Sequence, residues 1–276
     1  MFLTSVVAQV NNNFSNVIIG AKVNSVAVTV YSMAALIFGM YEQLSTAISG
    51  VMLPTVTNSL KNDDEKFTNT INLVKSTGRI QFLLLGAVFA GFAILGKQFI
   101  AIWLGDGYEQ VYYLVMILLG PALLELCINV CLSILRAKNM LGFRTGVITA
   151  SMVLNLIIVF VGLNYVGIYA AALGTAISIF VGSIVVMGIY YYRKLKLNIL
   201  TLYRGIFKGI WISILISAIV CYFTTYLVDG AMAEFIVGFV SFVVVYVLTL
   251  MLFGLNKEEK NIIYKTLNKK GEMKNG

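Results

Sequence analysis

The stretch that decides the fold spans residues 153–178 and reads VLNLIIVFVGLNYVGIYAAALGTAIS. It predicts the end of one membrane helix, a tight turn over residues 164–167, and the start of a second helix. The first part is apolar on all sides, which is typical of a helix that faces lipid or is buried in a bundle. Because the turn is so short, we expect the two helices to pack antiparallel.

Small residues recur at every fourth position of the second helix and continue beyond the quoted stretch. They are Ala170, Gly174, Ser178 and Gly182. A spacing of four places them on one ridge, and close backbone approach along such a ridge is a main source of packing energy in lipid. We therefore expect this ridge to lie against a neighbouring helix.

The composition extends the membrane interpretation to the whole chain. Of the 276 residues, 59% are hydrophobic and 12% are charged, and the mean hydropathy is +0.90. A soluble domain carries about 25% charged residues. An apolar excess of this size does not fit in a soluble core, so we predict an all-α, polytopic membrane helix bundle.

Eight segments are long enough to cross a hydrocarbon core of about 30 Å at about 1.5 Å per residue. The expected spans are residues 2–21, 26–57, 71–96, 110–135, 144–163, 168–192, 206–228 and 233–254.

The basic residues predict the orientation. All of them except Lys22 and Lys97 lie in or beside the second, fourth and sixth loops or in the tail after residue 256. The positive-inside rule places these segments, and with them both termini, in the cytoplasm. This asymmetry accounts for the net charge of +8, which gives no reason to expect a nucleic-acid partner.

Few residues suit catalysis or metal binding. The chain has no histidine, its loops are short, and Cys127, Cys131 and Cys221 all lie in apolar runs, where thiols usually pack. We expect no metal, no cofactor and no enzymatic activity.

Two carboxylates, Glu42 and Glu125, are predicted near the middle of spans. An ionisable group at that depth is costly unless it faces a cavity or a partner. Both are candidates for a proton or cation site or for a contact to cargo, and Gln43 adds polarity beside Glu42. The alternative is a protonated carboxyl group that hydrogen-bonds between helices.

A polar stripe marks the first span: Gln9, Asn12 or Asn13, and Asn16 recur at three- to four-residue spacing. Lipid would penalise such a face, so it should line a cavity or form a dry polar interface.

Three arginines, Arg79, Arg136 and Arg144, are expected near the cytoplasmic ends of spans. They could serve as topology anchors. Alternatively, one of them meets an anionic head group, because the guanidinium fork matches phosphate oxygens.

Several short motifs, taken in order, resemble the polysaccharide flippases of the multidrug/oligosaccharidyl-lipid/polysaccharide exporter superfamily. They are Asn16-Val17-Ile18-Ile19-Gly20, Val30-Tyr31-Ser32-x-Ala34, Leu53-Pro54, Ile102-Trp103-Leu104-Gly105 before Tyr108, Leu135-Arg136-Ala137-Lys138 before Arg144, and the hairpin with Asn155, Gly167 and residues 170–175. Each motif is weak alone, but their order and spacing over nearly the whole chain are fairly specific.

The resemblance implies an alternating-access carrier of two six-helix lobes in the bacterial cytoplasmic membrane. Residues 1–192 would be the C-terminal lobe, residues 193–256 two additional helices, and residues 257–276 a basic cytoplasmic tail. The implied cargo is an undecaprenyl-diphosphate-linked oligosaccharide for capsule, O-antigen or similar polymers. The facing lobe would be a missing N-terminal lobe or a second copy of the chain. Ser15 stands where many relatives have an acidic residue, so the resemblance supports no coupling-ion role there.

Other functions stay open at this stage. A multidrug or cation antiporter would belong to the same superfamily. A non-transporting membrane interaction subunit is a different class, because half a carrier lacks its facing lobe. A membrane glycosyltransferase or polymerase is disfavoured by the lack of a sizeable outer loop.

Overall fold

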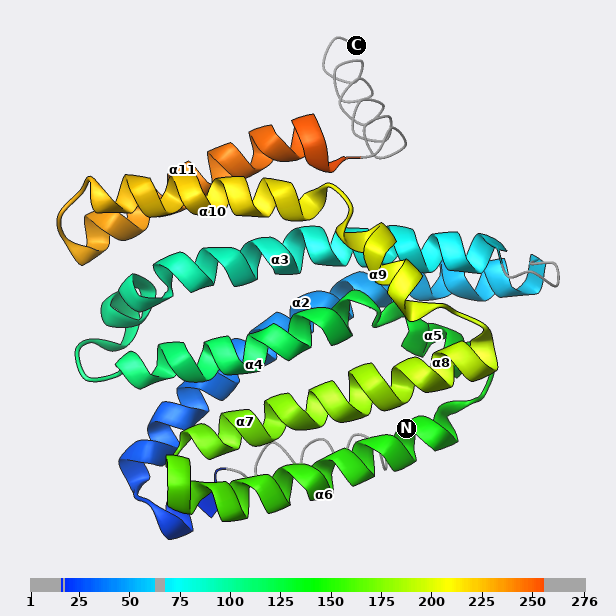
Figure 1. Ribbon diagram of the computed structural model, residues 1–276, viewed down its shortest axis with the longest axis horizontal. Helices are drawn as coiled ribbons and strands as arrows, with labels where there is room; N and C mark the ends of the chain where they lie inside the picture. The colour runs from blue at the N-terminus through cyan, green and yellow to red at the C-terminus, as the bar shows by residue number, and fades with distance from the viewer. Residues whose placement is uncertain (1–15, 17, 63–67, 256–276) are drawn as a thin grey trace, which may run out of the picture.

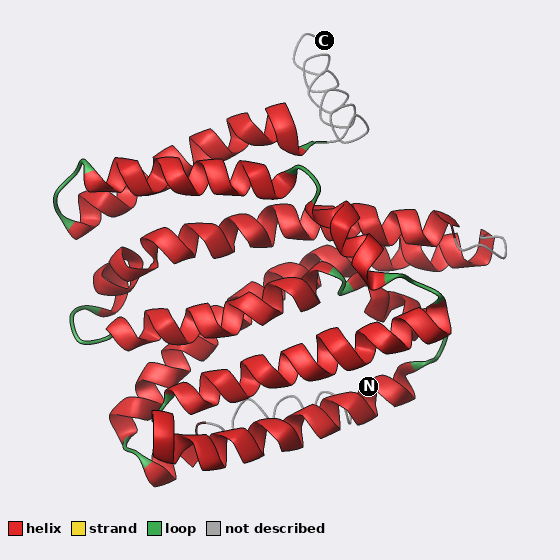
Figure 2. Ribbon diagram, viewed as in Figure 1, coloured by secondary structure: helices red, strands yellow, loops and turns green. Residues whose placement is uncertain are grey.

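The structure, a computed structural model, describes residue 16 and residues 18–62 and 68–255; within these ranges the chain is helical apart from short turns, and no strand occurs (Figures 1 and 2). Residues 18–22 are helical, and a long hairpin follows them. It consists of α2 (Ser25–Asn62) and α3 (Thr68–Leu104).

The remaining helices follow with short connections. They are α4 (Glu109–Cys127), α5 (Val130–Ala137), α6 (Leu141–Val166), α7 (Tyr169–Ser178), the π-helical segment η1 (Ile179–Val186), α8 (Met187–Leu195), α9 (Ile199–Phe207), α10 (Ile210–Tyr226), α11 (Ala231–Thr249) and the π-helical segment η2 (Leu250–Gly254). The segments α7, η1 and α8 form one continuous rod, as do α11 and η2.

Six helical rods in the described chain are long and apolar enough to cross a membrane, and α9 with α10, bent by 49°, would be a seventh. These seven match the second to eighth predicted spans, so the polytopic helix bundle is confirmed. Two predicted spans are not single helices: residues 110–135 divide into α4 and α5, and the segment that holds residues 206–228 bends between α9 and α10. Most of the first predicted span, residues 2–21, lies outside the described residues.

The helices stack in layers (Figure 1). The α10–α11 hairpin packs on α3, α3 packs on α2 and α4, α4 packs on α7 and η1, and these pack on α6. The hairpin predicted over residues 153–178 is thus the last layer, and its two helices are antiparallel. Many large side chains on the outer faces of α6, α10 and α11 are exposed, as is expected where a bundle meets lipid.

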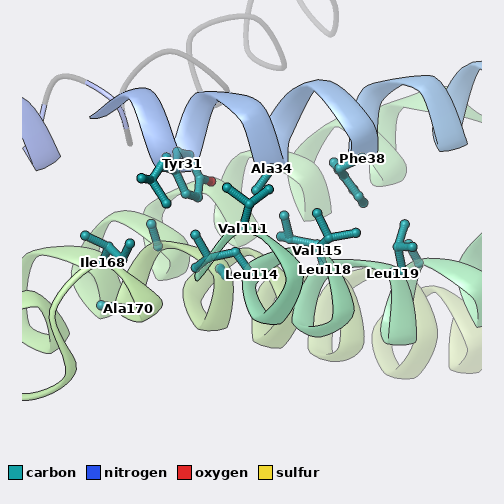
Figure 3. Close-up of a cluster of buried hydrophobic side chains, with 14 of the residues drawn as sticks. Tyr31, Ala34, Phe38, Val111, Leu114, Val115, Leu118, Leu119, Ile168 and Ala170 are labelled. Atoms are coloured by element: carbon teal, nitrogen blue, oxygen red, sulfur yellow. The ribbon is translucent and has the colours of Figure 1, made fainter. Parts of the chain in front are cut away.

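The largest core cluster joins α2, α4 and α7 (Figure 3). Tyr31, Ala34 and Phe38 of α2 face Val115 and Leu118 of α4. These side chains lie three or four positions apart along each helix, so one stripe of α2 meets one stripe of α4. The cluster fixes the two helices that carry Glu42 and Glu125.

Basic residues gather at one end of the bundle, and acidic residues lie at the other end. We call one end the basic end: there α5 joins α6 and α8 joins α9 (right in Figure 1). Its described basic residues include Arg136, Lys138, Arg144, Arg193, Lys194 and Lys196. The opposite end holds the α3–α4, α6–α7 and α10–α11 turns, with Asp106, Glu109 and Asp229.

Candidate functional site

A cavity of about 280 Å³ lies between α2, α4, α5 and the start of α6. Its wall contains charged side chains of both signs in an otherwise apolar bundle. The lining residues are Glu42, Thr46, Ser49, Gly50, Glu125, Leu126, Asn129, Leu132, Ser133, Arg136 and Arg144. Four residues predicted as site candidates, from three separate spans and the loop between them, therefore meet in one place.

The acidic side of the cavity consists of Glu42 on α2 and Glu125 on α4. Both side chains are half-buried, and they lie close enough for their charges to interact. Two carboxylates on adjacent helices form an arrangement that can share a proton or meet a cationic or hydroxyl-bearing ligand.

The basic side consists of Arg136 near the end of α5 and Arg144 in the first turns of α6. The turn between these helices places Asn139 at φ 54°, which reverses the chain and brings the two guanidinium groups to the same cavity. Arg136 is exposed, whereas Arg144 is half-buried. The charge of Arg144 acts on the Glu125 carboxylate of α4 and on the Tyr191 hydroxyl of α8.

The cavity depends on the break between α4 and α5. At Ile128 and Asn129 the helix tightens, because their backbone N–H groups donate to Glu125 O and Leu126 O, three residues back. The Asn129 side chain then turns inward, and its Nδ2 donates to Ser45 Oγ over 3.3 Å. The break thus brings Asn129 into the cavity wall between the acidic and basic sides.

A buried polar network supports the wall from behind. Nε2 of Gln81, on α3, donates to Ser45 Oγ at 3.1 Å and to Ser49 Oγ at 2.7 Å. Ser45 Oγ in turn donates to the Leu126 carbonyl at 3.4 Å, beside the break. Gln81 is fully buried. These bonds hold α2, α3 and the α4–α5 break in register, and Ser49 carries the network into the cavity.

The cavity shares a wall with an open groove of about 790 Å³ along the outer face of α2. Gly39, Glu42, Gln43, Thr46, Ala47, Gly50 and Val51 line the groove. Glu42, Thr46 and Gly50 border both spaces. Gln43, predicted to add polarity beside Glu42, is exposed and faces the groove rather than the cavity.

The structure describes one residue of the predicted polar stripe. Gln9, Asn12 and Asn13 fall outside the described residues, so the polar stripe stays a prediction. Asn16 is described, and its Oδ1 accepts a hydrogen bond of 3.3 Å from Ser32 Oγ on α2. This contact ties Asn16 to α2.

Arg79 does not reach the cavity. Its side chain is only 3% exposed and donates to backbone carbonyls at the ends of α9 and η2. The structure therefore gives it a packing role between helices, and the head-group candidates that line the cavity are Arg136 and Arg144.

The small-residue ridge faces α6. Ala170, Gly174, Ser178 and Gly182 are all buried. A Cβ atom added to Gly174 would meet Asn155 Oδ1, and one added to Gly182 would meet Ser151 Oγ. Only glycine allows α6 to approach this closely at the two positions.

Sequence reasoning missed the small polar residues of the site: Ser45, Ser49, Gln81, Asn129 and Ser133. A signal was present, since Ser45 and Ser49 lie three and seven positions after Glu42 and share its side of the helix. Within the described ranges no group of three or more His, Cys, Asp or Glu side chains is placed to hold a metal ion. The three cysteines are free and buried.

Known proteins resemble this architecture. Residues 1–113 match a family model described as polysaccharide biosynthesis protein. The solved structure of the lipid II flippase MurJ, in an inward closed conformation, superposes with a TM-score of 0.66 at 16% sequence identity. The predicted resemblance is confirmed. The aligned region covers 96% of this chain but 53% of the flippase, so the chain spans about half the length of that relative. A search of curated proteins gave no match.

Proposed function

We propose that this chain is one lobe of a carrier that flips lipid-linked oligosaccharides across the bacterial cytoplasmic membrane for the synthesis of a cell-surface polysaccharide. The cavity with two guanidinium groups inside an apolar bundle is the observation that carries this proposal. Two comparisons support it: the polysaccharide biosynthesis family over residues 1–113, and the fold of a lipid II flippase.

The chemistry of the cavity suits a polyprenyl diphosphate-linked sugar, for which undecaprenyl diphosphate is the expected carrier. Arg136 and Arg144 would receive the diphosphate, because a guanidinium fork donates two parallel hydrogen bonds to phosphate oxygens. The hydroxyl and amide groups of Thr46, Ser49 and Asn129 would meet the sugar. The lipid tail would stay in the bilayer, beside the exposed apolar faces of the helices.

Transport would follow from rocking of this lobe against a facing lobe, with the site alternately open to each side. In this proposal residues 1–192 form the lobe, residues 193–256 add two helices, and residues 257–276 form a cytoplasmic tail. The groove along α2, which continues into the cavity, is the surface that would face a separate N-terminal lobe or a second copy of the chain. Both termini and the basic end would lie in the cytoplasm.

The test replaces Arg144 with glutamine. The chain is reconstituted in vesicles with the facing lobe, and flipping of a fluorescent undecaprenyl-diphosphate-linked oligosaccharide is measured. A hydrogen bond to a charged group contributes about 1.5–3 kcal/mol, so Arg144→Gln should slow flipping by roughly 10- to 100-fold. Arg193→Gln is the matched control, because Arg193 is exposed at the basic end and outside the cavity wall.

Unchanged flipping by a folded Arg144→Gln protein would remove the head-group role of Arg144. If the unsubstituted lobes do not flip the probe at all, a non-transporting interaction subunit becomes the better proposal. Drug export without sugar flipping would favour the antiporter.

A further inference from the structure

The buried arginine of α3 joins two segments that are distant in the sequence. Arg79 Nη1 donates to Gly205 O at 3.1 Å and to Lys208 O at 2.9 Å, and Arg79 Nη2 donates to Gly254 O at 2.8 Å. Gly205 and Lys208 lie at the end of α9, and Gly254 is the last residue of η2. One guanidinium group therefore bridges the start and the end of the α10–α11 hairpin.

The acceptors explain why a cation lies here. The last carbonyl groups of a helix have no partner within that helix, and they carry partial negative charge from the helix dipole. Two such helix ends converge on Arg79. A buried guanidinium would be costly alone, but here it supplies the donors that both ends lack.

The local backbone is built for close approach. Gly209, between α9 and α10, has φ +85°, and a Cβ atom there would lie 2.6 Å from the Phe253 carbonyl oxygen. A Cβ atom added to Gly78, next to Arg79, would lie 2.5 Å from Ile206 Cδ1 of α9. Side chains at either position would push apart the segments that Arg79 holds together.

Two further contacts attach the hairpin along α3. Near the middle, Tyr246 Oη donates to Leu83 O at 2.7 Å. At the opposite end, Gln98 Nε2 donates to Glu234 Oε2 at 3.0 Å. Between them Phe242 packs with Ala90 and Leu95 of α3. The α10–α11 hairpin thus follows α3 from Arg79 toward its C-terminal end, while the first part of α3 extends beyond the hairpin (Figure 1).

We propose that Arg79 fastens the α10–α11 hairpin to α3, so that the hairpin and the rest of the bundle move as one rigid body. Because α3 also packs on α2 and α4, a rocking motion of the cavity-bearing helices carries the hairpin with it. The hairpin is then an extension of the lobe and not an independent gate. This inference does not depend on the identity of the cargo.

The experiment measures the distance between α6 and α11. Nitroxide labels are placed at Ile157 and Val244, two exposed positions on these helices, in a background whose three buried cysteines are replaced by alanine. Pulsed dipolar spectroscopy of the full chain in lipid nanodiscs should give one narrow distance. The Arg79→Gln protein should lose this narrow distance and show a broad distribution of distances between the two labels. Arg193→Gln, an exposed arginine at the same end, is the control and should keep the narrow distance.

Arg79→Lys addresses a possible folding defect of Arg79→Gln. The lysine keeps the positive charge that the two helix ends stabilise, but one ammonium group cannot span both ends as the guanidinium fork does. It should therefore fold and still broaden the distribution. A narrow distance retained in either folded Arg79 variant would overturn the proposal, as would a broad distribution with Arg79 in place.

Discussion

At the scale of single residues, opposite charges converge in one cavity of an otherwise apolar bundle, toward its basic end. Glu42, Glu125, Arg136 and Arg144 line one cavity although they lie up to about a hundred positions apart in the sequence. Glu125 lies close enough to Arg144 for their charges to interact. In the proposed function, a bound diphosphate would compete with Glu125 for the guanidinium group of Arg144.

Replacing the two carboxylates should have unequal effects. Glu42 borders both the cavity and the groove, whereas Glu125 borders only the cavity. We expect Glu42→Gln to reduce polymer export more than Glu125→Gln, by roughly tenfold for the loss of one charged hydrogen-bonding group. The assay is complementation of export in cells that also supply the facing lobe. Glu109→Gln, exposed at the opposite end, is the control; full activity of both cavity variants would refute the carboxylate role.

Residue types in the spans predicted part of this site. Charged residues inside apolar segments are rare and conspicuous, so Glu42 and Glu125 could be selected from the sequence. Arg136 and Arg144 could be selected as basic residues at the ends of spans. For Ser45 and Ser49 the one signal was their place on the side of the helix that carries Glu42. Asn129 had no such signal, because the break that brings it into the cavity wall depends on a contact with another helix. For Arg79, the sequence could not reveal that two helix ends converge on its side chain.

At the scale of elements, the α6–α7 hairpin is held by a glycine contact. Gly174→Ala would place a methyl group against Asn155 Oδ1. Overpacking of a tight contact costs about 1–3 kcal/mol, so this variant should unfold at a lower temperature in detergent. Gly188→Ala makes the same chemical change in α8, where nothing lies within 4 Å of the added Cβ, and it should be neutral or stabilise by roughly 0.5–1 kcal/mol. Equal melting temperatures for the two variants would contradict the close-packing account.

The ends of the helices were harder to predict from the sequence pattern than the helices themselves. The hydrophobic runs predicted the membrane-spanning helical rods correctly. A segment in lipid must satisfy its backbone hydrogen bonds within itself, and a helix does so. The break at Ile128 and Asn129 was not predicted. Pro121, the evident helix breaker of that span, lies inside α4 without ending it. Tertiary contacts stabilise the break, because both Asn129 Nδ2 and the Leu126 carbonyl hydrogen-bond with Ser45 of α2. A local sequence pattern cannot predict a contact with another helix.

At the scale of the whole molecule, charge asymmetry predicts one orientation in the membrane. Cysteine placed singly at Lys196 or at Asp106 should react differently with a membrane-impermeant maleimide in intact cells. The Asp106→Cys protein should be labelled in intact cells. The Lys196→Cys protein should be labelled only after the membrane is permeabilised. Both positions are exposed in the structure, so burial does not explain a difference. Labelling of the Lys196→Cys protein in intact cells would show that the chain has the opposite orientation in the membrane.

The spaces on the two sides of α2 have one consequence for any chemical probe of this protein. Thr46 is exposed and touches both the cavity and the groove. A bulky maleimide adduct on a Thr46→Cys protein would therefore obstruct the cavity and the groove at once.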